Sequence, residues 1–295
     1  MLYRPTFEAS DGPAAARPAP GGDLLPRYFA RIDYDGPAEP TLAVLRALHA
    51  AHIAAIPFEA IDALVEGNVD IGAEAVAAKL IEGGRGGYCF EQNGLFLRVL
   101  RAIGFEAEGL LGRVRWLRDP AAPPAPRSHM VVRVRVDGRA WLADVGFGSA
   151  VPPAPLAMDG AAPQPTAHES YRVARGDAGS GIWEVSIAIG DDWAPLYDID
   201  DAPAPAIDYE VANWYTSTHP DSHFRHQLIA ARTTARARYA LRDNRLTIRH
   251  ADGSSERRYL TADAIEAALV ELFGLAVRPH WRAAIERAAT AEVEG

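Results

Sequence analysis

The stretch GGRGGYCFEQNGLFLRVLRAIGF, residues 83–105, decides how the chain is organised. Its first five residues form a glycine-rich turn, and the apolar residues after the turn share one face of a helix: Leu95, Phe96, Val99, Leu100 and Ile103. Gly104 is expected to end that helix, as glycine commonly does. Cys89, the only cysteine, therefore lies at the start of a helix and directly after a tight turn.

Helical patterns precede this stretch. The segment 41–56, TLAVLRALHAAHIAAI, has Thr41 as an expected N-cap and apolar residues three and four apart. A further helix is expected over 73–81. Residues 1–22, rich in Ala, Pro and Gly, show no amphipathic period and are expected to form a mobile tail.

After Phe105 the apolar period changes from 3.6 to 2. The segment HMVVRVRVDGRAWLADVGFG, 129–148, alternates on both sides of Asp137-Gly138, which is a strong signal for a two-residue hairpin turn. Further strands are expected in SYRVAR and GIWEVSIAIG, whereas the Pro-rich stretches 119–126 and 152–165 are expected to be exposed loops.

The last third mixes both patterns. A helix is expected from about residue 207, then a second hairpin-like region, and then a helix with Thr261 as N-cap. Helices, strands and a mixed segment in this order predict an α+β fold with three consecutive units. We expect a helical unit at 23–104, a strand unit at 105–205 and a mixed unit at 206–295.

Composition excludes several classes of protein. The 295-residue chain has a formal net charge of −9 and a pI near 5.5, so no basic excess exists to meet nucleic-acid phosphates. No apolar run reaches the roughly 18–20 residues that cross a bilayer, and the first residues lack the pattern of a secretory signal. We therefore expect a cytoplasmic protein that acts without nucleic acid or membrane.

A lone cysteine cannot form an internal disulfide or a multi-thiolate metal site, so it is either a small buried hydrophobe or a nucleophile. A position at a helix start favours the nucleophile, because unpaired N–H groups and the helix dipole stabilise a thiolate. No metal site is expected. His219, His223 and His226 lie in a polar segment, which we interpret as solvated.

A base for this thiol is predicted by the hairpin. If Asp137 and Gly138 form the turn, then His129 lies opposite Gly146. The side chain of Asp144 then shares a face with His129 as its diagonal neighbour, about 7–8 Å away between Cα atoms. In this reading Cys89 is the nucleophile, His129 withdraws its proton, and Asp144 orients the ring and stabilises the imidazolium. Each residue alone could be structural, but their joint occurrence favours catalysis.

These motifs resemble those of the arylamine N-acetyltransferases. The resemblance rests on RGGYCFEQN at 85–93, SHMVV at 128–132 and DVGFG at 144–148, with weaker matches at IPFEA, 56–60, and ANWYTSTHP, 212–220. It extends from about Leu24 to about Leu275.

The resemblance implies an N-terminal helical bundle, a central β-barrel and a C-terminal α/β lid, with a cysteine-protease-like catalytic core. It implies ping-pong transfer of an acetyl group from acetyl-CoA to an aromatic amine or hydrazine, with a role in xenobiotic metabolism. It also places Phe58, Phe147 and Ser128 at the substrate and Tyr215 at coenzyme A. Ala60 departs from the family, in which Asn is common at this position.

Three other functions remain open at this stage. Triad logic alone cannot separate a transferase from a cysteine hydrolase, because water can replace the amine as acceptor. An amide synthase of natural-product biosynthesis would use the same scaffold, and a non-catalytic binding protein could keep the fold. The oligomeric state is also open, with a homo-oligomer as one option.

Overall fold

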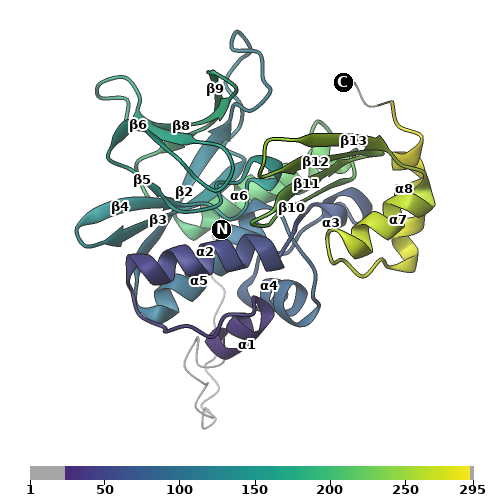
Figure 1. Cartoon of the computed structure of the whole chain (residues 1–295), viewed down its shortest axis with the longest axis horizontal. Coiled ribbons are helices and arrows are strands. Elements are labelled where there is room, and N and C mark those ends of the chain that lie inside the picture. Colours follow the sequence, from purple (N-terminus) through teal and green to yellow (C-terminus); the bar gives the residue numbers. More distant parts are fainter. Residues whose placement is uncertain (1–23, 293–295) are drawn as a thin grey trace, which may run out of the picture.

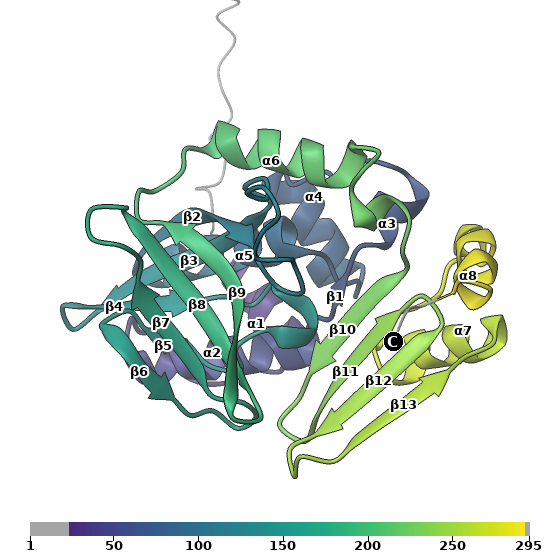
Figure 2. The same ribbon diagram turned by 90° about the horizontal axis from the view of Figure 1, so that it is seen from above.

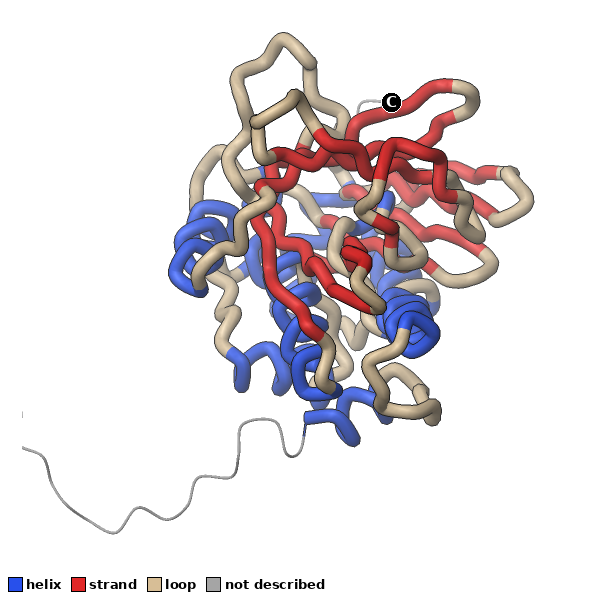
Figure 3. The backbone as a smooth tube through the Cα atoms, turned by 90° about the vertical axis from the view of Figure 1, so that its left-hand side faces the viewer, coloured by secondary structure: helices blue, strands red, loops and turns tan. Residues whose placement is uncertain are grey.

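A computed structural model describes residues 24–292. The tail expected at 1–22 lies outside the described residues. Helices gather on one side of the molecule and most strands on the other, as Figure 3 shows. Among residues 24–292, none of the helices has the length and apolar character needed to span a bilayer.

The first helices pack around the segment that carries Cys89. They are α1 (Leu24–Arg31), α2 (Leu42–Ala55), α4 (Ala73–Ala77), the π-helical turn η1 (Ala78–Glu82) and α5 (Cys89–Ile103). Thr41 caps α2 by accepting a hydrogen bond from the N–H of Val44, and Gly104 ends α5 with a left-handed φ of 104°. Both helix ends agree with the sequence pattern. Their shared core is apolar and includes Leu45, Leu48, Leu95 and Phe96.

The middle of the chain forms an eight-stranded antiparallel sheet that curls into a nearly closed barrel (Figure 1). Its strand order is β5-β4-β3-β2-β9-β8-β7-β6. The bounds are β2 Glu106–Val114, β3 His129–Val136, β4 Arg139–Ala143, β5 Leu156–Ala157, β6 Gly160–Gln164, β7 Tyr171–Arg175, β8 Ile182–Ile189 and β9 Asp192–Asp200, with the 3-10 turn η2 at Gly148–Ala150.

One loop prediction is wrong in part, because 152–165 contains β5 and β6. Leu156 and Ala157 are buried, and the side chain of Gln164 bonds both the N–H and the C=O of Ala157. These bonds join the two outermost strands and draw the sheet toward closure. Pro163 is tolerated because β6 is an edge strand.

The C-terminal part is a five-stranded antiparallel sheet in the order β1-β10-β11-β12-β13, covered by helices on one face. Its elements are β10 (Ile229–Thr233), β11 (Ala237–Arg242), β12 (Arg245–His250), β13 (Ser255–Tyr259), α7 (Ala262–Glu271), η4 (Pro279–Trp281) and α8 (Arg282–Ala289). Figure 1 shows α7 and α8 on the outer side of this sheet. Thr261 caps α7 as expected.

A short piece of the N-terminal region joins this C-terminal sheet. β1 (Phe58–Glu59) pairs with β10, and Ile61 and Leu64 of α3 (Ile61–Val65) lie in the same core as Trp281. The proposed unit boundaries, 23–104, 105–205 and 206–295, are therefore crossed by the segment 58–65.

The barrel and the C-terminal sheet are bridged by α6 (Ala206–Thr218) and the turn η3 (His223–Arg225). In Figure 2, α6 runs along one side of the molecule from the barrel toward α3. The hydroxyl of Tyr88 donates to Asn213 of α6, and Asn213 donates to the C=O of Val69. α6 thus contacts the residue that immediately precedes Cys89.

Candidate active site

Cys89 is the first residue of α5 and exposes 4% of its surface. Tyr88 is the N-cap, and its N–H donates to the carboxylate of Glu91 over 3.1 Å, as in a capping box. The glycine turn is required by close packing, because a Cβ at Gly86 would lie 2.1 Å from the C=O of Pro57. The thiol Sγ lies 3.6 Å from the C=O of Ser128.

The predicted hairpin register is confirmed. Val136 pairs with Arg139 and Val132 pairs with Ala143, and both turn residues have positive φ, 51° at Asp137 and 75° at Gly138. β4 nevertheless ends at Ala143, so the ladder stops before it reaches Gly146.

The chain turns at this point because Asp144 Oδ1 accepts a hydrogen bond from the N–H of Gly146 over 2.9 Å. On the other side of β3, His129 pairs in register with Gly112 of β2. Its side chain still meets Asp144, since Nε2 donates to Oδ2 over 2.8 Å.

Asp144 is fully buried and accepts four hydrogen bonds. Oδ2 accepts from His129 and from the hydroxyl of Tyr197 over 2.8 Å, and Oδ1 accepts from Asn93 and Gly146 over 2.9 Å. Burial alone would raise the pKa of Asp144, but the charge of His129 and these hydrogen bonds hold that pKa below its usual value. Asp144 is therefore a carboxylate at neutral pH.

His129 is fixed as the cationic partner of this carboxylate. Burial lowers its pKa, but Asp144 and Cys89 together outweigh burial and raise the pKa of His129 to about 10. Because Nε2 is used by Asp144, the other ring nitrogen is the one that remains for a hydrogen bond with Cys89. An imidazolium at neutral pH is the counter-charge that a cysteine thiolate needs.

Two further residues hold the Asp144 loop against the helices. Asn93, one turn after Cys89, donates to the C=O of Met130 over 2.7 Å and accepts from the N–H of Val145 over 3.0 Å. His49 of α2 donates from Nε2 to the C=O of Asp144 over 3.1 Å. α2, α5 and β3 therefore converge on one residue, Asp144.

The start of α5 is held by a second buried chain of hydrogen bonds. The hydroxyl of Tyr28 donates to Nδ1 of His52 over 2.8 Å, and Nε2 of His52 donates to Gln92 over 2.6 Å. Burial lowers the pKa of His52 to about 3, so this ring stays neutral. Gln92 in turn donates to the C=O groups of Pro57 and Gly87.

The residues expected at the substrate fall into two groups. Phe147 packs edge-on against His129 at a centroid distance of 5.0 Å, and Phe58 reaches the same area, because a Cβ at Gly148 would lie 3.6 Å from its ring. Ser128 presents its C=O to Cys89. Tyr215 lies on α6 and stacks on His219 at a ring-centroid distance of 4.4 Å; within residues 24–292, no hydrogen bond or ring contact joins it to the triad.

Sequence reasoning missed Tyr197 and gave no role to Asn93. Asn93 had a readable signal, because residues four apart on a helix share a face and Cys89 is four residues earlier. Tyr197 had none, since it lies on β9, whose neighbour in the barrel cannot be inferred from a linear pattern.

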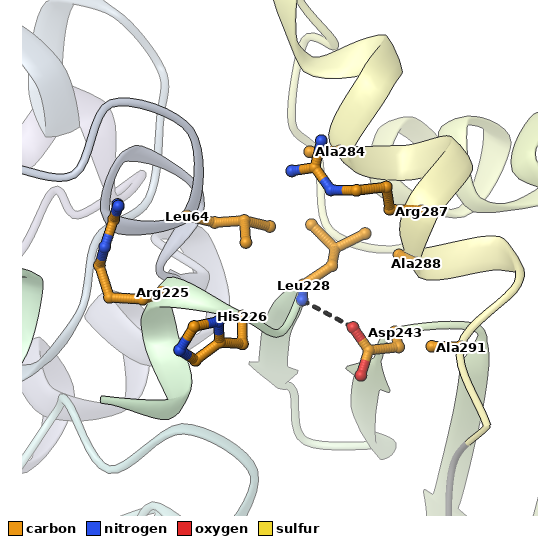
Figure 4. A pocket seen from close by; sticks show the side chains of 9 residues that line it. All are labelled: Leu64, Arg225, His226, Leu228, Asp243, Ala284, Arg287, Ala288 and Ala291. Atoms are coloured by element: carbon orange, nitrogen blue, oxygen red, sulfur yellow. Dashed lines mark hydrogen bonds between the residues drawn. The ribbon is translucent and has the colours of Figure 1, made fainter. Parts of the chain in front are cut away.

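Two hollows in the described part of the chain lie outside the triad. One, of about 280 Å³, lies between η3, β10 and α8 and is lined by Leu64, Arg225, His226, Leu228, Asp243, Ala284, Arg287, Ala288 and Ala291 (Figure 4). The other, of about 660 Å³, includes Arg127, the neighbour of Ser128, and residues 200–204. Within residues 24–292, no group of three or more His, Cys, Asp or Glu residues could hold a metal ion.

Comparison with known proteins assigns the geometry to a family. A family model described as N-acetyltransferase matches residues 41–282. The arylamine N-acetyltransferase of Mycolicibacterium smegmatis is 42% identical over 253 residues, which cover 84% of this chain and 90% of that protein. The chain belongs to the arylamine N-acetyltransferase family.

Solved structures agree with this assignment. The arylamine N-acetyltransferase of Mycobacterium marinum in complex with CoA has a TM-score of 0.85 and 38% identity, covering 90% of this chain and 99% of that one. The Salmonella typhimurium enzyme has a TM-score of 0.83 and 33% identity, covering 90% of this chain and 98% of that one. The predicted order of helical bundle, barrel and C-terminal α/β region is confirmed for this arylamine N-acetyltransferase.

Proposed function

We propose that this enzyme moves an acetyl group from acetyl-CoA to an aromatic amine or hydrazine by a ping-pong mechanism through acetylated Cys89. The observation that carries the proposal is the buried contact series from Cys89 to His129 to Asp144. Relatives named arylamine N-acetyltransferase, one of them in complex with CoA, support both substrates.

The first half-reaction uses the thiolate–imidazolium pair. The Cys89 thiolate attacks the carbonyl carbon of the acetyl thioester, and a tetrahedral intermediate forms. As the intermediate collapses, the bond from carbon to the CoA sulfur breaks. The departing CoA thiolate takes the proton from His129, which leaves a neutral imidazole beside acetylated Cys89.

The second half-reaction restores the resting state. The amine nitrogen attacks the acetyl carbon, and His129 accepts the proton that this nitrogen loses. Collapse then breaks the bond from carbon to Cys89 Sγ, so that the amide leaves and the thiolate faces an imidazolium again. Asp144 stabilises that imidazolium throughout.

Substrate contacts are assigned by position. Phe58 and Phe147 offer aromatic faces near His129, which suit a flat aromatic acceptor. We assign Ser128 to the substrate because it adjoins the thiol, and Tyr215 to coenzyme A on the basis of the family motif alone. A cytoplasmic location and a role in xenobiotic metabolism complete the proposal.

The donor half-reaction is tested by intact mass after mixing with acetyl-CoA and no acceptor. Wild type should gain the mass of one acetyl group, and Cys89→Ala should gain none while remaining folded. An unmodified wild-type chain, or an acetylated Cys89→Ala chain, would contradict the mechanism.

The acceptor half-reaction separates the alternatives. Acetyl-enzyme freed from acetyl-CoA should decay faster as the concentration of an arylamine rises, with the acetylated amine as product. A decay rate independent of every amine, with acetate as the product, would instead identify a hydrolase.

A further inference from the structure

Lys79 is the only lysine among the 30 Lys and Arg residues of the sequence. Arginine and lysine are not interchangeable, because a guanidinium is a flat fork of donors and an ammonium is a compact charge with three divergent donors. A compact ammonium suits a site where several carboxylates converge on one point. Lys79 is also largely buried, with 14% of its side chain exposed.

The surroundings of Lys79 match this need. It lies in the π-helical turn η1, and its Nζ is 2.7 Å from Glu91, 2.7 Å from Asp62 and 4.0 Å from Glu59. These carboxylates come from α5, α3 and β1. An ammonium has three divergent donors, which suit carboxylates that converge on one atom from different elements.

The other cation in this cluster is committed elsewhere. Arg85 pairs with Glu59 over 2.7 Å and with Asp62 over 2.6 Å. Its guanidinium also lies 4.6 Å from the ring centre of Trp281. Among residues 24–292, Lys79 is thus the cation that pairs directly with Glu91.

Glu91 connects this cluster to the nucleophile. Oε1 accepts from Lys79, and Oε2 accepts from the N–H of Tyr88, the residue before Cys89. Packing is tight here, because a Cβ at Gly87 would lie 2.7 Å from Oε2. Any change in the position or charge of this carboxylate therefore reaches the backbone that presents the thiol.

We propose that Lys79 is a positioning residue for acyl transfer: it holds Glu91 ionised, and ionised Glu91 fixes the Tyr88 N–H and so the direction of Cys89. The role in transfer rests on the proposed function, but the positioning of the thiol does not. The groups that face Glu91 are Lys79, Glu59 and Tyr88. Burial raises the pKa of Glu91 to about 7, so its ionisation near neutral pH depends on this lysine.

The test is the pH dependence of Cys89 alkylation by iodoacetamide, which needs no acetyl-CoA and reports one thiol. In wild type we expect a step in the rate near neutral pH as Glu91 ionises. In Lys79→Met the step should move up by at least one pH unit, and the rate at pH 7 should fall at least about fivefold. Glu91→Gln should lack the step.

The double variant separates positioning from general packing. If Lys79 acts through Glu91, then adding Lys79→Met to Glu91→Gln should change the rate less than twofold. Arg98→Met is the matched control, because it removes a half-buried cation of α5 that does not contact Glu91. An equal loss from Lys79→Met in both backgrounds, or an unshifted step in the single variant, would overturn the proposal.

A second measurement leaves Lys79 itself unaltered. Lysine labelled with ¹³C at its ε-carbon gives one NMR signal from this chain, because it has one lysine. That signal should move with a midpoint equal to that of the alkylation step, and it should not move in Glu91→Gln. A signal insensitive to pH across the alkylation step would refute the link between the two groups.

Discussion

At the scale of single residues, the site depends on one carboxylate that accepts four hydrogen bonds. Asp144→Asn should keep the bond from Gly146 but place an amide N–H or an uncharged oxygen against the donors of His129 and Tyr197. The imidazolium then loses its charge partner, and we expect single-turnover acetylation to fall by about 10³- to 10⁴-fold. Tyr197→Phe, which keeps the charge, should lose far less. Near-normal rates in Asp144→Asn would show that the pairing has no role in transfer.

Gly146 provides a steric test at the same scale. A Cβ there would lie 2.8 Å from Cys89 Cα and 2.8 Å from the Asn93 amide, so Gly146→Ala must push the Asp144 loop away from α5. We expect a loss of about 1–3 kcal/mol in the free energy of unfolding, together with slow alkylation of Cys89. Urea denaturation and iodoacetamide rates measure both.

Gly94→Ala is the control for this change. Gly94 lies in α5, and a Cβ there would meet nothing within 4 Å. It should stabilise the helix by about 0.5–1 kcal/mol. If both alanine variants lowered stability equally, the close approach at Gly146 would not be the cause.

The residues that sequence could identify are those with a local signal. Cys89 follows a glycine turn, and His129 and Asp144 flank a hairpin whose parity can be counted. Tyr197 reaches Asp144 only because β9 is placed in the barrel, and Glu91 reaches Lys79 only within a buried cluster of charges. Neither contact can be inferred from the spacing of residues along the sequence. Roles depend on such contacts, whereas residue types and helix starts can be read from the chain.

At the scale of elements, the regular patterns were informative and the short strands were not. Thr41 and Thr261 cap helices where expected, and the Asp137-Gly138 turn sets the hairpin register. β5 and β6 were missed because proline and small residues mask strands held by tertiary contacts. The sequence pattern predicted one continuous helix over 73–81 and did not show that its last turn, 78–82, is π-helical.

The junction between the barrel and the C-terminal sheet depends on Arg238 of β11. This residue is 1% exposed, donates to the C=O of Val151 and the hydroxyl of Tyr171, and pairs with Glu169 over 2.9 Å. Arg238→Met should leave these groups unpaired and lower the free energy of unfolding by about 3–5 kcal/mol in urea denaturation.

Arg258→Met is the comparison for this variant. Arg258 pairs with Glu256 at the surface, with 59% of its side chain exposed, so its removal should cost less than about 1 kcal/mol. Similar losses in the two variants would show that the buried junction contributes nothing beyond a surface pair.

At the scale of the whole molecule, buried histidines predict how stability depends on pH. The folded-state pKa of His129 is raised to about 10, so its contribution is complete below about pH 6.5 and is lost as pH rises toward 10. The pKa values of His49 and His52 are lowered to about 4 and about 3, so stability also falls as pH decreases below 6.5. Glu91, with its raised pKa, offsets part of the acid loss.

Urea denaturation at a series of pH values should therefore show greatest stability near pH 6 to 7. His129→Gln should flatten the alkaline limb, because it removes the group that releases a proton there. An alkaline limb of the same slope in His129→Gln would mean that another group governs it.

The order of the three units could be predicted from the change in apolar period along the sequence. The pairing of segment 58–65 with the C-terminal sheet could not. β1 has only two residues, and its partner β10 lies about 170 residues later in the chain. No local sequence pattern could therefore predict that these two strands pair. Long-range pairings of this kind are fixed by tertiary contacts, here the burial of Ala230 and the ion pair of Glu59 with Arg85, and not by propensity.

That pairing also sets the order in which the molecule can mature on the ribosome. At about 5–20 residues per second, β10 emerges roughly ten to thirty seconds after β1. During that interval Ile61 and Leu64 lack the core that Trp281 completes. β1, which bridges to Gly87 on one side, also lacks its partner β10 on the other side. The segment before Cys89 can therefore complete its packing only after the C-terminal strands and helices have been synthesised. The thiol is present on the nascent chain before the contacts that support its segment can form.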